Sequence, residues 1–348
     1  MLVVGESPSA MTYCQTINKT LVPQVKEQSC VIDLFAGCGG LSLGFEAAGF
    51  KTIGYEMVAS ATETYNKNLA GGCRQCKLEV GFDYPAAEIV IGGPPCQPFS
   101  VRGKQHGMRD ARDGFPIFID AVRRLQPKVF LFENVRNLMF SHRWYFDLIL
   151  NELRELGYVV EYRCLNAVHY GVPQNRERVI TVGHRSEFDF PKEAARPVTV
   201  WEAIGDTMHE AFEGCHFLTA SQDRYIAEYE RKSHCRKPRD LFEDSPARTI
   251  TCRNLAGATS DMLRVRLPDG RRRRISIREA ARLQSFPDWY EFCGNEVQQF
   301  TQIGNAVPPL LAYQLALSVK DALQRKNCGA TEIVRKNTAI AIGPLFAA

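Results

Sequence analysis

From Val31 onward the chain alternates short apolar runs with segments of helical spacing, and this alternation limits the folds open to it. The first apolar run is followed by a glycine-rich turn, Ala36 to Gly40, and then by a helical segment that stops at Gly49. The pattern predicts strands at 31–35, 51–55, 88–91, 128–132, 158–165 and 178–182, and helices at 41–49, 59–68, 115–125, 144–156, 277–284 and 310–323. Strands that alternate with helices predict an α/β fold, in which a doubly wound, mostly parallel sheet is covered by helices on both faces.

A second, smaller domain is expected where the alternation stops, near Glu187. The following residues, up to about 275, hold prolines, scattered aromatic residues and mixed charge. We therefore divide the chain into four parts. Residues 1–29 are an N-terminal extension, and residues 30–186 and 276–326 form the main domain. Residues 187–275 form the smaller domain, and residues 327–348 are a C-terminal tail. The extension is polar and weakly patterned, so we expect it to be loosely held, and we expect the tail to be frayed.

Cysteine usage and hydropathy exclude several classes of protein. The chain of 348 residues has 12 cysteines without regular spacing, which is typical of reduced thiols in the cytoplasm. The one CxxC pair, Cys73 and Cys76, has no second pair at zinc-binding spacing, so we expect no metal site. No apolar run approaches the roughly 18 residues of a membrane span, and the N-terminus has no signal-peptide pattern. We expect a cytoplasmic protein without a membrane segment.

Positive charge is concentrated in one segment, although the net charge is only +4. Eight arginines lie from Arg264 to Arg282, and Arg271 to Arg274 form an unbroken run. Such a stripe is typical of phosphate contacts. A solvated turn is the alternative, because Pro268-Asp-Gly270 marks the tip of a hairpin.

The carboxyl ends of the predicted strands are where chemistry is expected, because ligands of such sheets bind there. The turn Asp33-Leu-Phe-Ala-Gly-Cys-Gly-Gly40 follows the first strand, and its glycines let the backbone approach a ligand closely. Glu56 ends the second strand, where a carboxylate accepts hydrogen bonds from ribose hydroxyls. The pair indicates a nucleoside cofactor, although the glycine spacing differs from that of dinucleotide sites.

Cys96 follows a third predicted strand, in the segment Gly92-Gly-Pro-Pro-Cys-Gln-Pro-Phe-Ser100. Its neighbouring prolines fix the backbone and remove amide donors. A buried structural cysteine needs no such framing, whereas a nucleophilic thiolate must meet its target at a defined angle. The next residues, up to Gly114, are rich in glycine and basic side chains and are expected to form a mobile lid. His106 in that loop is a candidate base for the thiol, and a solvent-facing histidine is the alternative.

Two further polar motifs lie at strand ends. Glu133-Asn-Val135 follows the strand at 128–132, at the same sheet edge as Cys96, where a carboxyl could protonate a ring nitrogen. Gln174-Asn-Arg-Glu-Arg178 leads into another strand and supplies guanidinium donors. Its two arginines, Arg176 and Arg178, are spaced to point to the same side of an extended chain.

These motifs, taken in order, resemble those of the cytosine-C5 DNA methyltransferases, over roughly residues 31–320. They are Asp33 to Gly40 with Glu56, Gly93 to Ser100, Glu133 to Val135, Gln174 to Arg178, Arg278-Glu-Ala-Ala-Arg-Leu-Gln-Ser-Phe-Pro287 and Gly304-Asn-Ala-Val-Pro-Pro309. The resemblance implies a methyltransferase with a Rossmann-like fold and with S-adenosyl-L-methionine as its cofactor. It also implies methyl transfer to C5 of a flipped-out cytosine in a specific double-stranded DNA sequence.

The resemblance assigns the catalytic roles. The thiolate of Cys96 adds to C6 of the cytosine, Glu133 hydrogen-bonds N3 and the amino group, and Arg178 holds the ring from its O2 side, with Arg176 beside it. C5 then takes the methyl group, and loss of its proton expels the cysteine. General chemistry agrees, because an aromatic C5 is a poor nucleophile until a group adds across the 5,6 bond. The target atoms lie inside a duplex stack, so the base must be extruded.

The resemblance also assigns a cofactor site. Its expected residues are Phe35, Ala36, Gly37, Cys38 and Gly40 along the cofactor, Glu56 at the ribose, Met57 at the adenine, Pro95, Asn305 and Val307 at the methionine end, and Phe115 in the wall. One motif departs from the family, which usually has an aspartate before the strand that leads to the cysteine. That stretch, Cys76 to Val80, has none. Leu78, Glu79 and Asp83 are the alternatives for the adenine contact.

The segment 187–275 corresponds to the family's target-recognition region, which reads bases in the major groove. Its candidate readers are Arg224, Arg231, Arg236, Arg239, Arg248 and Arg253. Arginine contacts to guanine would fit a site containing G and C, and contacts to phosphate or solvent are the alternative. Counting the loop and the hairpin, the expected DNA contacts are Ser100, Arg102, Lys104, Gln105, Arg253, Arg271 and Arg272.

Two other functions stay open on the sequence. A tRNA cytosine-C5 methyltransferase would use the same catalytic domain, although the Cys-Phe-Thr signature of RNA-acting relatives is missing here. A catalytically inactive nucleic-acid-binding relative is opposed by the intact Cys96, Glu133 and Arg178. The implied partners are double-stranded DNA and a cognate restriction endonuclease that acts separately. We expect a monomer, because one flipped base needs only one pocket.

Overall fold

The computed structural model describes residues 12–27, 29–95, 113–193, 196–232, 234, 239–256 and 261–325. The residues with predicted roles that lie outside these ranges are Cys96, Ser100, Arg102, Lys104, Gln105, His106 and Arg236. The roles of these side chains therefore stay predictions, as does the mobile lid. The predicted tail at 327–348 also lies outside the described residues.

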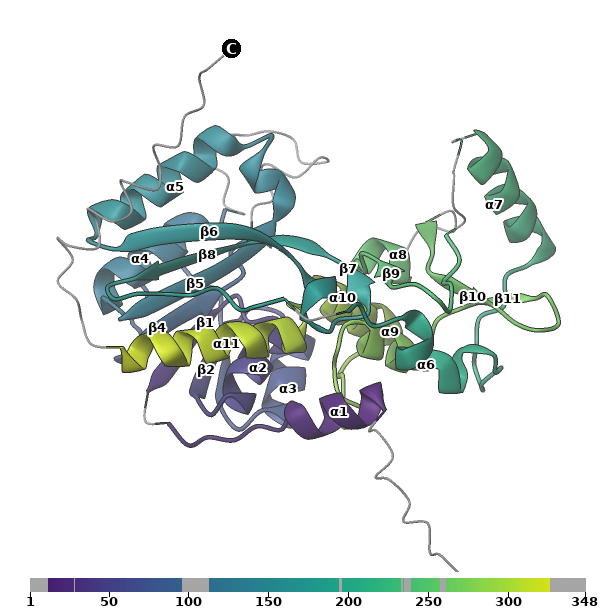
Figure 1. The fold of residues 1–348 in the computed structure, drawn as a ribbon, viewed down its shortest axis with the longest axis horizontal. Coiled ribbons are helices and arrows are strands. Elements are labelled where there is room, and N and C mark those ends of the chain that lie inside the picture. Colours follow the sequence, from purple (N-terminus) through teal and green to yellow (C-terminus); the bar gives the residue numbers. More distant parts are fainter. Residues whose placement is uncertain are drawn as a thin grey trace, which may run out of the picture.

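A seven-stranded sheet forms the centre of the molecule (Figure 1). In spatial order its strands are β3 (Gly72–Gln75), β2 (Lys51–Glu56), β1 (Cys30–Leu34), β4 (Ile89–Gly92), β5 (Val129–Val135), β8 (Glu177–His184) and β6 (Val159–Asn166). The pairs from β3 to β5 are parallel, whereas β8 is antiparallel to both β5 and β6. The direction of winding reverses between β1 and β4, which is where ligands bind in such sheets. The predicted doubly wound, mostly parallel fold is confirmed.

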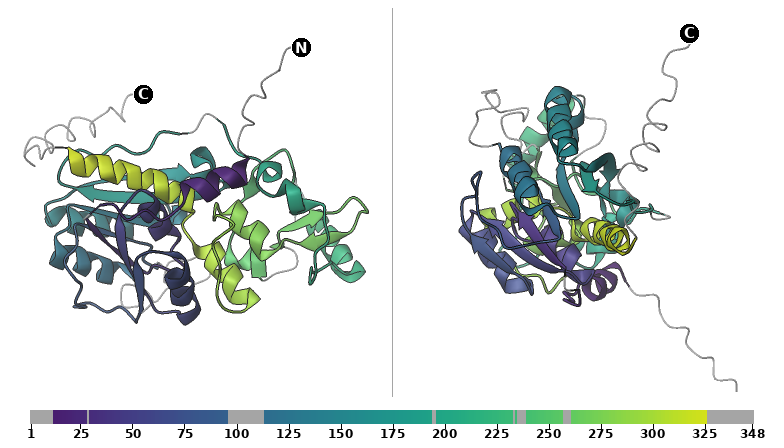
Figure 2. Two further views of the ribbon diagram at one scale, coloured as in Figure 1. Left: turned by 90° about the horizontal axis from the view of Figure 1, so that it is seen from below. Right: turned by 90° about the vertical axis from the view of Figure 1, so that its left-hand side faces the viewer.

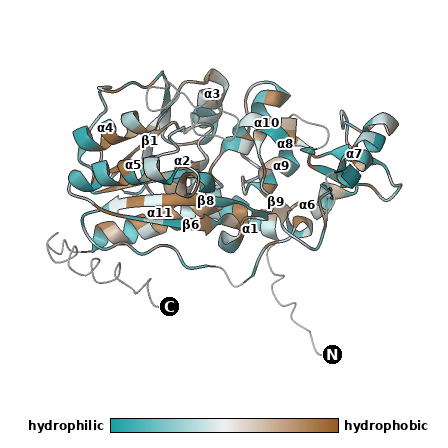
Figure 3. Cartoon of the chain, turned by 90° about the horizontal axis from the view of Figure 1, so that it is seen from above, coloured by the Kyte–Doolittle hydropathy of each residue, from teal (hydrophilic) through white to brown (hydrophobic). Residues whose placement is uncertain are grey.

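Helices cover both faces of this sheet. They are α2 (Gly40–Ala47), α3 (Ala59–Asn68), α4 (Phe115–Leu125), α5 (Arg143–Glu155) and α11 (Pro309–Gln324), with short 3-10 turns η3 (Arg136–Met139) and η4 (Ala167–Tyr170). On one face, Phe45 of α2 and Leu315 of α11 share a buried cluster with Leu131 of β5. On the other face, Phe118 of α4 and Phe146 of α5 pack with strand residues. The sheet lies between these two layers (Figure 2), and its strands carry much of the hydrophobic colour in Figure 3.

A close contact between α2 and α11 brings distant motifs together. A Cβ atom on Gly44 of α2 would lie 2.4 Å from the backbone nitrogen of Tyr313, so only glycine permits this approach. Helix α2 begins at the glycine turn, and α11 begins at Pro308-Pro309. The Gly304–Pro309 motif is therefore placed beside the turn that follows β1.

Apart from the N-terminal helix, the remaining elements form a smaller part, which lies beside the sheet in Figure 1. They are β7 (Gln174–Asn175), α6 (Val200–Met208), α7 (Ala220–Lys232), β9 (Ala247–Arg248), α8 (Cys252–Ala256), β10 (Arg264–Arg266), β11 (Arg272–Arg274), α9 (Ile277–Leu283) and α10 (Glu296–Asn305). β10 and β11 form an antiparallel pair around Gly270, whose φ of 88° fits the predicted hairpin tip. Helices α6, α8, α9 and α10 contribute to one buried cluster. The domain boundary at residue 275 stays a prediction, because α9 and α10 pack with helices on its other side.

The N-terminal segment is docked, so the expectation that residues 1–29 are loosely held is wrong for residues 12–27. Helix α1 (Tyr13–Thr20) begins at a capping box formed by Thr12 and Gln15. Ile17 is fully buried, and the thiol of Cys14 donates to the carbonyl oxygen of Ala203 in α6 at 3.4 Å. The capping box was a sequence signal for this helix, but a run of eight residues offered too short a pattern.

Candidate functional site

The turn after β1 has a backbone that few side chains tolerate. Phe35, Gly37 and Gly39 have φ angles of 60°, 56° and 87°, which lie in the left-handed region. A Cβ atom on Gly39 would lie 2.6 Å from Leu69 Cδ1, so this glycine lets α3 pack closely. A Cβ atom on Gly37 would meet no atom within 4 Å. The turn therefore leaves open space beside the backbone of Gly37.

Glu56 is fixed against this turn. Its Oε2 atom accepts a hydrogen bond from the amide of Gly37 at 2.9 Å. Its Oε1 atom accepts from the amides of Met57 and Val58 at 2.9 and 2.8 Å. The carboxylate thus lies where β2 ends beside the open space, and the Met57 side chain next to it is 63% exposed.

A second carboxyl group, which the sequence analysis gave no role, lies beneath the same turn. Asp33 is almost completely buried, and burial raises its pKa to about 7. Its Oδ2 atom accepts from the hydroxyl of Ser42 at 2.6 Å, while its Oδ1 atom has no hydrogen-bond partner among the described residues. The buried, unpartnered oxygen gives the turn a second acceptor.

The alternatives for the adenine contact differ in their surroundings. Leu78 is buried in the cluster that holds Leu34 and Tyr55. Glu79 is exposed and lies 3.4 Å from Lys77, and the side chain of Asp83 is fully exposed. Of the three, only Leu78 belongs to the wall behind the turn.

Phe115 has a different environment from the one expected. It is fully buried and makes edge-on ring contacts with Phe132 and Tyr145, with centroids 5.3 and 5.9 Å apart. Because no part of its ring is exposed, the structure places Phe115 in the core behind the expected cofactor wall.

The Gly304–Pro309 motif meets the glycine turn, as the resemblance implies. A Cβ atom on Gly40 would lie 2.5 Å from the carbonyl oxygen of Val307. The Cys38 thiol donates to the carbonyl oxygen of Gln302 at 3.6 Å, while Asn305 is exposed at the end of α10. The structure therefore brings Ala36, Cys38, Gly40 and Val307 into one neighbourhood.

Glu133 and Arg178 form an ion pair where β5 and β8 run side by side. The Nε atom of Arg178 lies 2.9 Å from Oε1 of Glu133, and the two side chains are only 13% and 12% exposed. Low exposure strengthens such a pair relative to one in water. The predicted partners for a cytosine ring are therefore next to each other at one edge of the sheet.

The backbone that leads to Cys96 is tied to the strand that carries Glu133. The side-chain amide of Asn134 donates to the carbonyl oxygen of Pro94 at 2.9 Å, and Asn134 itself is buried. The amide of Gly114 donates to the carbonyl oxygen of Pro95 at 2.9 Å. Asn134 was missed from the sequence, and its only signal was its place directly after Glu133.

Arg176 is bound by backbone carbonyls, whereas Arg178 pairs with Glu133, so the assignment of Arg176 to the catalytic residues needs correction. Arg176 is buried, and its guanidinium donates to the carbonyl oxygens of Ile250, Ala306 and Gly304 at 2.7, 3.0 and 3.3 Å. Burial lowers its pKa to about 9, with Arg178 adding to the shift. Its hydrogen bonds join three distant segments, so Arg176 is a positioning residue.

Two buried glutamines complete this junction. Gln174 donates to the carbonyl oxygen of Leu283 at 2.9 Å and accepts from the amide of Ile250 at 3.0 Å. Gln284 bonds Gln174 and donates to the carbonyl oxygens of Ile303 and Ala306. The motifs at 174–178, 278–287 and 304–309 thus meet through buried side-chain amides, which satisfy one another's hydrogen bonds.

The arginine run is not a uniform basic surface, because β11 alternates its side chains. Arg273 is fully buried, with both terminal nitrogens 2.8 Å from the carboxylate oxygens of Glu279. Arg274 lies 2.5 Å from the carboxylate of Glu296. These two arginines neutralise acids within the protein, so the expectation of phosphate contacts along the whole run is wrong.

The other two members of the run were expected to contact DNA, and both have acidic partners. Arg272 is mostly buried, and its Nε atom lies 3.7 Å from both Asp223 and Asp240. Arg271 is exposed but pairs with Asp269 at 2.7 Å. The structure gives no support for Arg272 as a phosphate contact and leaves Arg271 as a compensated charge at the hairpin tip.

A membrane-spanning helix and a metal site are both missing from the described ranges. Within them, no helix combines the length and the apolar character that crossing a bilayer requires. No group of three or more His, Cys, Asp or Glu residues there is arranged to hold a metal ion.

Comparisons with known proteins agree with the motif order. The family model described as C-5 cytosine-specific DNA methylase matches residues 30–321. The chain is 56% identical over 307 residues to the Type II methyltransferase M.AplI of Arthrospira platensis, covering 87% of this chain and 88% of that protein. It is 32% identical over 370 residues to the Type II methyltransferase M.BspRI of Lysinibacillus sphaericus, covering 90% and 87% of the two chains.

Solved structures share the fold at low sequence identity. A DNA modification methyltransferase encoded within a prophage of E. coli has a TM-score of 0.62 at 23% identity, covering 86% of this chain and all of that chain. Spodoptera frugiperda DNMT2 has a TM-score of 0.67 at 17% identity, covering 84% and 100%. At these identities the likeness concerns the fold.

Proposed function

The chain belongs to the family of C-5 cytosine-specific DNA methylases, and we propose that it transfers a methyl group from S-adenosyl-L-methionine to C5 of a flipped-out cytosine in a specific duplex DNA sequence. The hydrogen bond from Asn134 to Pro94 is the main support for this mechanism. It ties the backbone two residues before Cys96 to the strand that carries Glu133. This bond would thereby hold the nucleophile and the group that activates its target close to one sheet edge.

The reaction at the cytosine follows from these groups. The thiolate of Cys96 would form a bond to C6, and the electron pair of the 5,6 bond becomes available at C5. One oxygen of Glu133 would accept from the exocyclic amino group, and the other, carrying a proton, would donate to N3 and so draw electron density from the ring. Arg178, paired with Glu133 at 2.9 Å, would hold the ring at O2. C5 would then form a bond to the methyl group as the methyl–sulfur bond breaks and its electron pair stays on sulfur. Loss of the C5 proton would re-form the double bond and release the thiolate.

The residues around the turn after β1 fit S-adenosyl-L-methionine, which supplies an electrophilic methyl group when bound. The carboxylate of Glu56 lies beside the open space at Gly37, where ribose hydroxyls would donate to it. The unpartnered Oδ1 atom of Asp33 gives a buried acceptor near the same turn. Leu78 and Met57 would contact the adenine ring from two sides.

The restriction-modification role is proposed from relatives rather than from geometry. The curated relatives named above are Type II methyltransferases, so we propose a restriction-modification role with a separate endonuclease of the same specificity. We also propose action in the cytoplasm as a monomer. The Dnmt2 structures share the fold at 17% identity and do not favour the tRNA alternative.

A side-by-side assay tests the substrate. The purified protein is given labelled S-adenosyl-L-methionine with duplex DNA or with tRNA, and bisulfite sequencing of DNA from expressing cells maps the methylated sites. We expect methyl incorporation into duplex DNA at one sequence. Incorporation into tRNA alone would overturn the assignment of DNA as the substrate. No incorporation into either nucleic acid would overturn the proposal that the protein is an active methyltransferase.

A further inference from the structure

Three arginines of the smaller part share one carboxylate. Asp261 Oδ1 lies 2.9 Å from Nη1 of Arg239 and 3.0 Å from Nη1 of Arg248, and Asp261 Oδ2 lies 3.8 Å from Nε of Arg253. Arg248 also donates to the backbone oxygen of Asp261. We call these four residues the Asp261 cluster. Its ion pairs leave two of the three positive charges uncompensated within the described residues.

In a neighbouring group, by contrast, the charges of the arginines are balanced by acidic side chains. Arg264 pairs with Glu230 at 2.8 Å and with Asp240. Arg266 and Arg272 lie 3.6 and 3.7 Å from Asp240, and Arg272 also lies 3.7 Å from Asp223. The described residues of this second group, the Asp240 cluster, are three arginines and three acids. Of these two clusters, only the Asp261 cluster has more arginines than acids among the described residues, although the sequence places the longest arginine run elsewhere.

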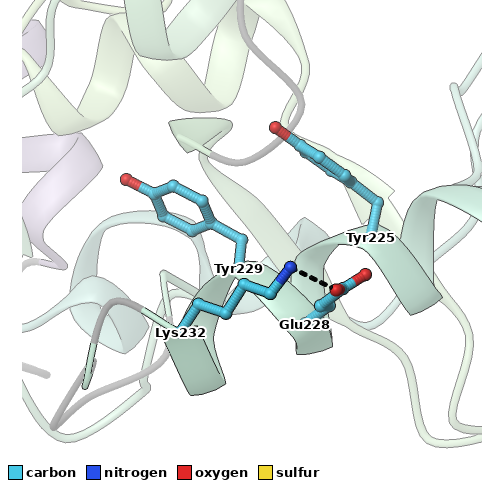
Figure 4. Close-up of a pocket in the computed structure, with 4 residues that line it drawn as sticks. All are labelled: Tyr225, Glu228, Tyr229 and Lys232. Carbon is cyan, nitrogen blue, oxygen red and sulfur yellow. Dashed lines mark ion pairs between the residues drawn. The ribbon is translucent and has the colours of Figure 1, made fainter.

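The charged side chains that line a surface cavity on α7 also balance each other. A surface cavity of about 300 Å³ is lined there by Tyr225, Glu228, Tyr229 and Lys232, and the ammonium group of Lys232 lies 2.6 Å from Glu228 (Figure 4). Because its one cation pairs with its one acid, this hollow has no excess charge to attract an anion.

The Asp261 cluster adjoins the catalytic edge of the sheet. Strand β9, which ends at Arg248, pairs with β7, and Arg248 is in register with Asn175. The hydroxyl of Thr249 donates to the carbonyl oxygen of Asn175 at 2.6 Å. Asn175 is three residues before Arg178, the partner of Glu133. DNA whose cytosine entered the site would therefore pass close to this cluster.

The three arginines are also crowded, so their arrangement depends on the carboxylate between them. Burial lowers the pKa of Arg248, Asp261 opposes this shift, and Arg239 adds to it. The Nε–H groups of Arg239 and Arg248 are buried and have no hydrogen-bond partner among the described residues. Without Asp261 these guanidinium groups would repel one another and separate.

Resting on the proposed function, we propose that Asp261 positions Arg239, Arg248 and Arg253 as one preformed guanidinium cluster that contacts the target DNA. Guanidinium forks bind phosphate oxygens and the O6 and N7 atoms of guanine with paired hydrogen bonds. Arg253 has the longest distance to Asp261 and is 48% exposed, so it makes the outermost contact. Arg248 is held by both the carboxylate and the backbone of Asp261 and supports the others.

Arg253→Ala and Arg266→Ala form a matched pair, because these arginines are 48% and 54% exposed but belong to the unbalanced and the balanced cluster. The probe is a duplex carrying the bisulfite-mapped site, compared with a duplex in which that site is scrambled. Equilibrium binding is measured over a range of salt concentrations. We expect Arg253→Ala to weaken binding of the mapped duplex about tenfold, with Arg266→Ala within about twofold of wild type.

The same measurement identifies the DNA group that is contacted. A phosphate contact lowers affinity for both duplexes and reduces the salt slope by about 1, whereas a guanine contact lowers affinity mainly for the mapped duplex. Equal binding by the Arg253→Ala and Arg266→Ala variants would overturn the proposal. Methylation by the wild-type protein is measured first on the same duplex, so that a failure of the cluster is distinguished from a failure of the proposed function.

Asp261→Asn tests positioning separately from charge. The substitution adds one net positive charge, so a role limited to electrostatic attraction predicts tighter binding to both duplexes. Positioning predicts weaker binding to the mapped duplex and a smaller ratio of mapped to scrambled affinity. Tighter or unchanged binding would overturn positioning by Asp261, and unchanged cofactor affinity would show that the variant is folded.

Discussion

Replacing Asn134 by alanine removes the hydrogen bond that holds Pro94 and is predicted to slow methyl transfer as well as destabilise the fold. The bond is 2.9 Å long and buried, and its loss leaves the Pro94 carbonyl without a partner among the described residues. A buried, unsatisfied group of this kind costs about 1–3 kcal/mol of stability. Pro94 is two residues from Cys96, and a displacement of about 1 Å at a reacting group costs about 100-fold in rate.

Tyr158→Phe is a matched control. The Tyr158 hydroxyl donates to another proline carbonyl, that of Pro127, at 2.7 Å and is also buried. Pro127 precedes the start of β5, whereas Glu133 lies near its end. Urea denaturation should show similar losses of stability for the two variants.

Steady-state methyl incorporation separates the two variants. Asn134→Ala should lower kcat about 100-fold with little change in KM for S-adenosyl-L-methionine, and Tyr158→Phe should keep kcat within about twofold of wild type. If Asn134→Ala had the same kcat as Tyr158→Phe at equal loss of stability, the bond would be structural only, and the reasoning would fail.

Three further predictions concern buried or paired groups. Glu133→Gln should lower kcat by about 100-fold or more without loss of cofactor affinity measured by calorimetry, and near-normal turnover would exclude the role of this carboxyl. Arg176→Met leaves the carbonyls of Ile250 and Gly304 without their guanidinium donor, while Ala306 keeps its hydrogen bond from Gln284. The free energy of unfolding should fall by about 2 kcal/mol or more, and an unchanged urea midpoint would refute this. Burial raises the pKa of Asp33 to about 7, so the folded protein holds a proton that the unfolded chain releases above about pH 4. Wild-type stability should therefore fall, relative to Asp33→Asn, as pH rises through this window, and a pH-independent difference between the two would contradict the burial argument.

Much of the sheet could be predicted because buried strands and amphipathic helices have regular spacing. The helices expected at 59–68 and 115–125 coincide with α3 and α4. Strand order could not be predicted in the same way, because the placement of β8 between β5 and β6 depends on long-range pairing. The short edge strand β3 (Gly72–Gln75) was missed, since one buried residue in four gives no pattern.

The site was predictable where a motif lies directly after a strand, and unpredictable where partners come from distant segments. Glu56 and Glu133 lie where a strand-end rule places them. Arg176 looked like Arg178 in sequence, but its partners come from residues 250–306, so its burial could not be read locally. Arg273 shows the same limit, because alternation along a strand does not say which face meets Glu279.

A covalent trap tests the central claim, which is that Cys96 attacks the cytosine ring. A duplex with 5-fluorocytosine at the mapped position is incubated with the protein and S-adenosyl-L-methionine, and adducts are separated under denaturing conditions. Fluorine at C5 cannot leave as a proton does, so the wild-type protein should stay bonded to DNA. Cys96→Ser should bind the cofactor normally and give no adduct. An adduct with Cys96→Ser, or none with a wild-type protein that methylates ordinary DNA, would contradict the covalent route.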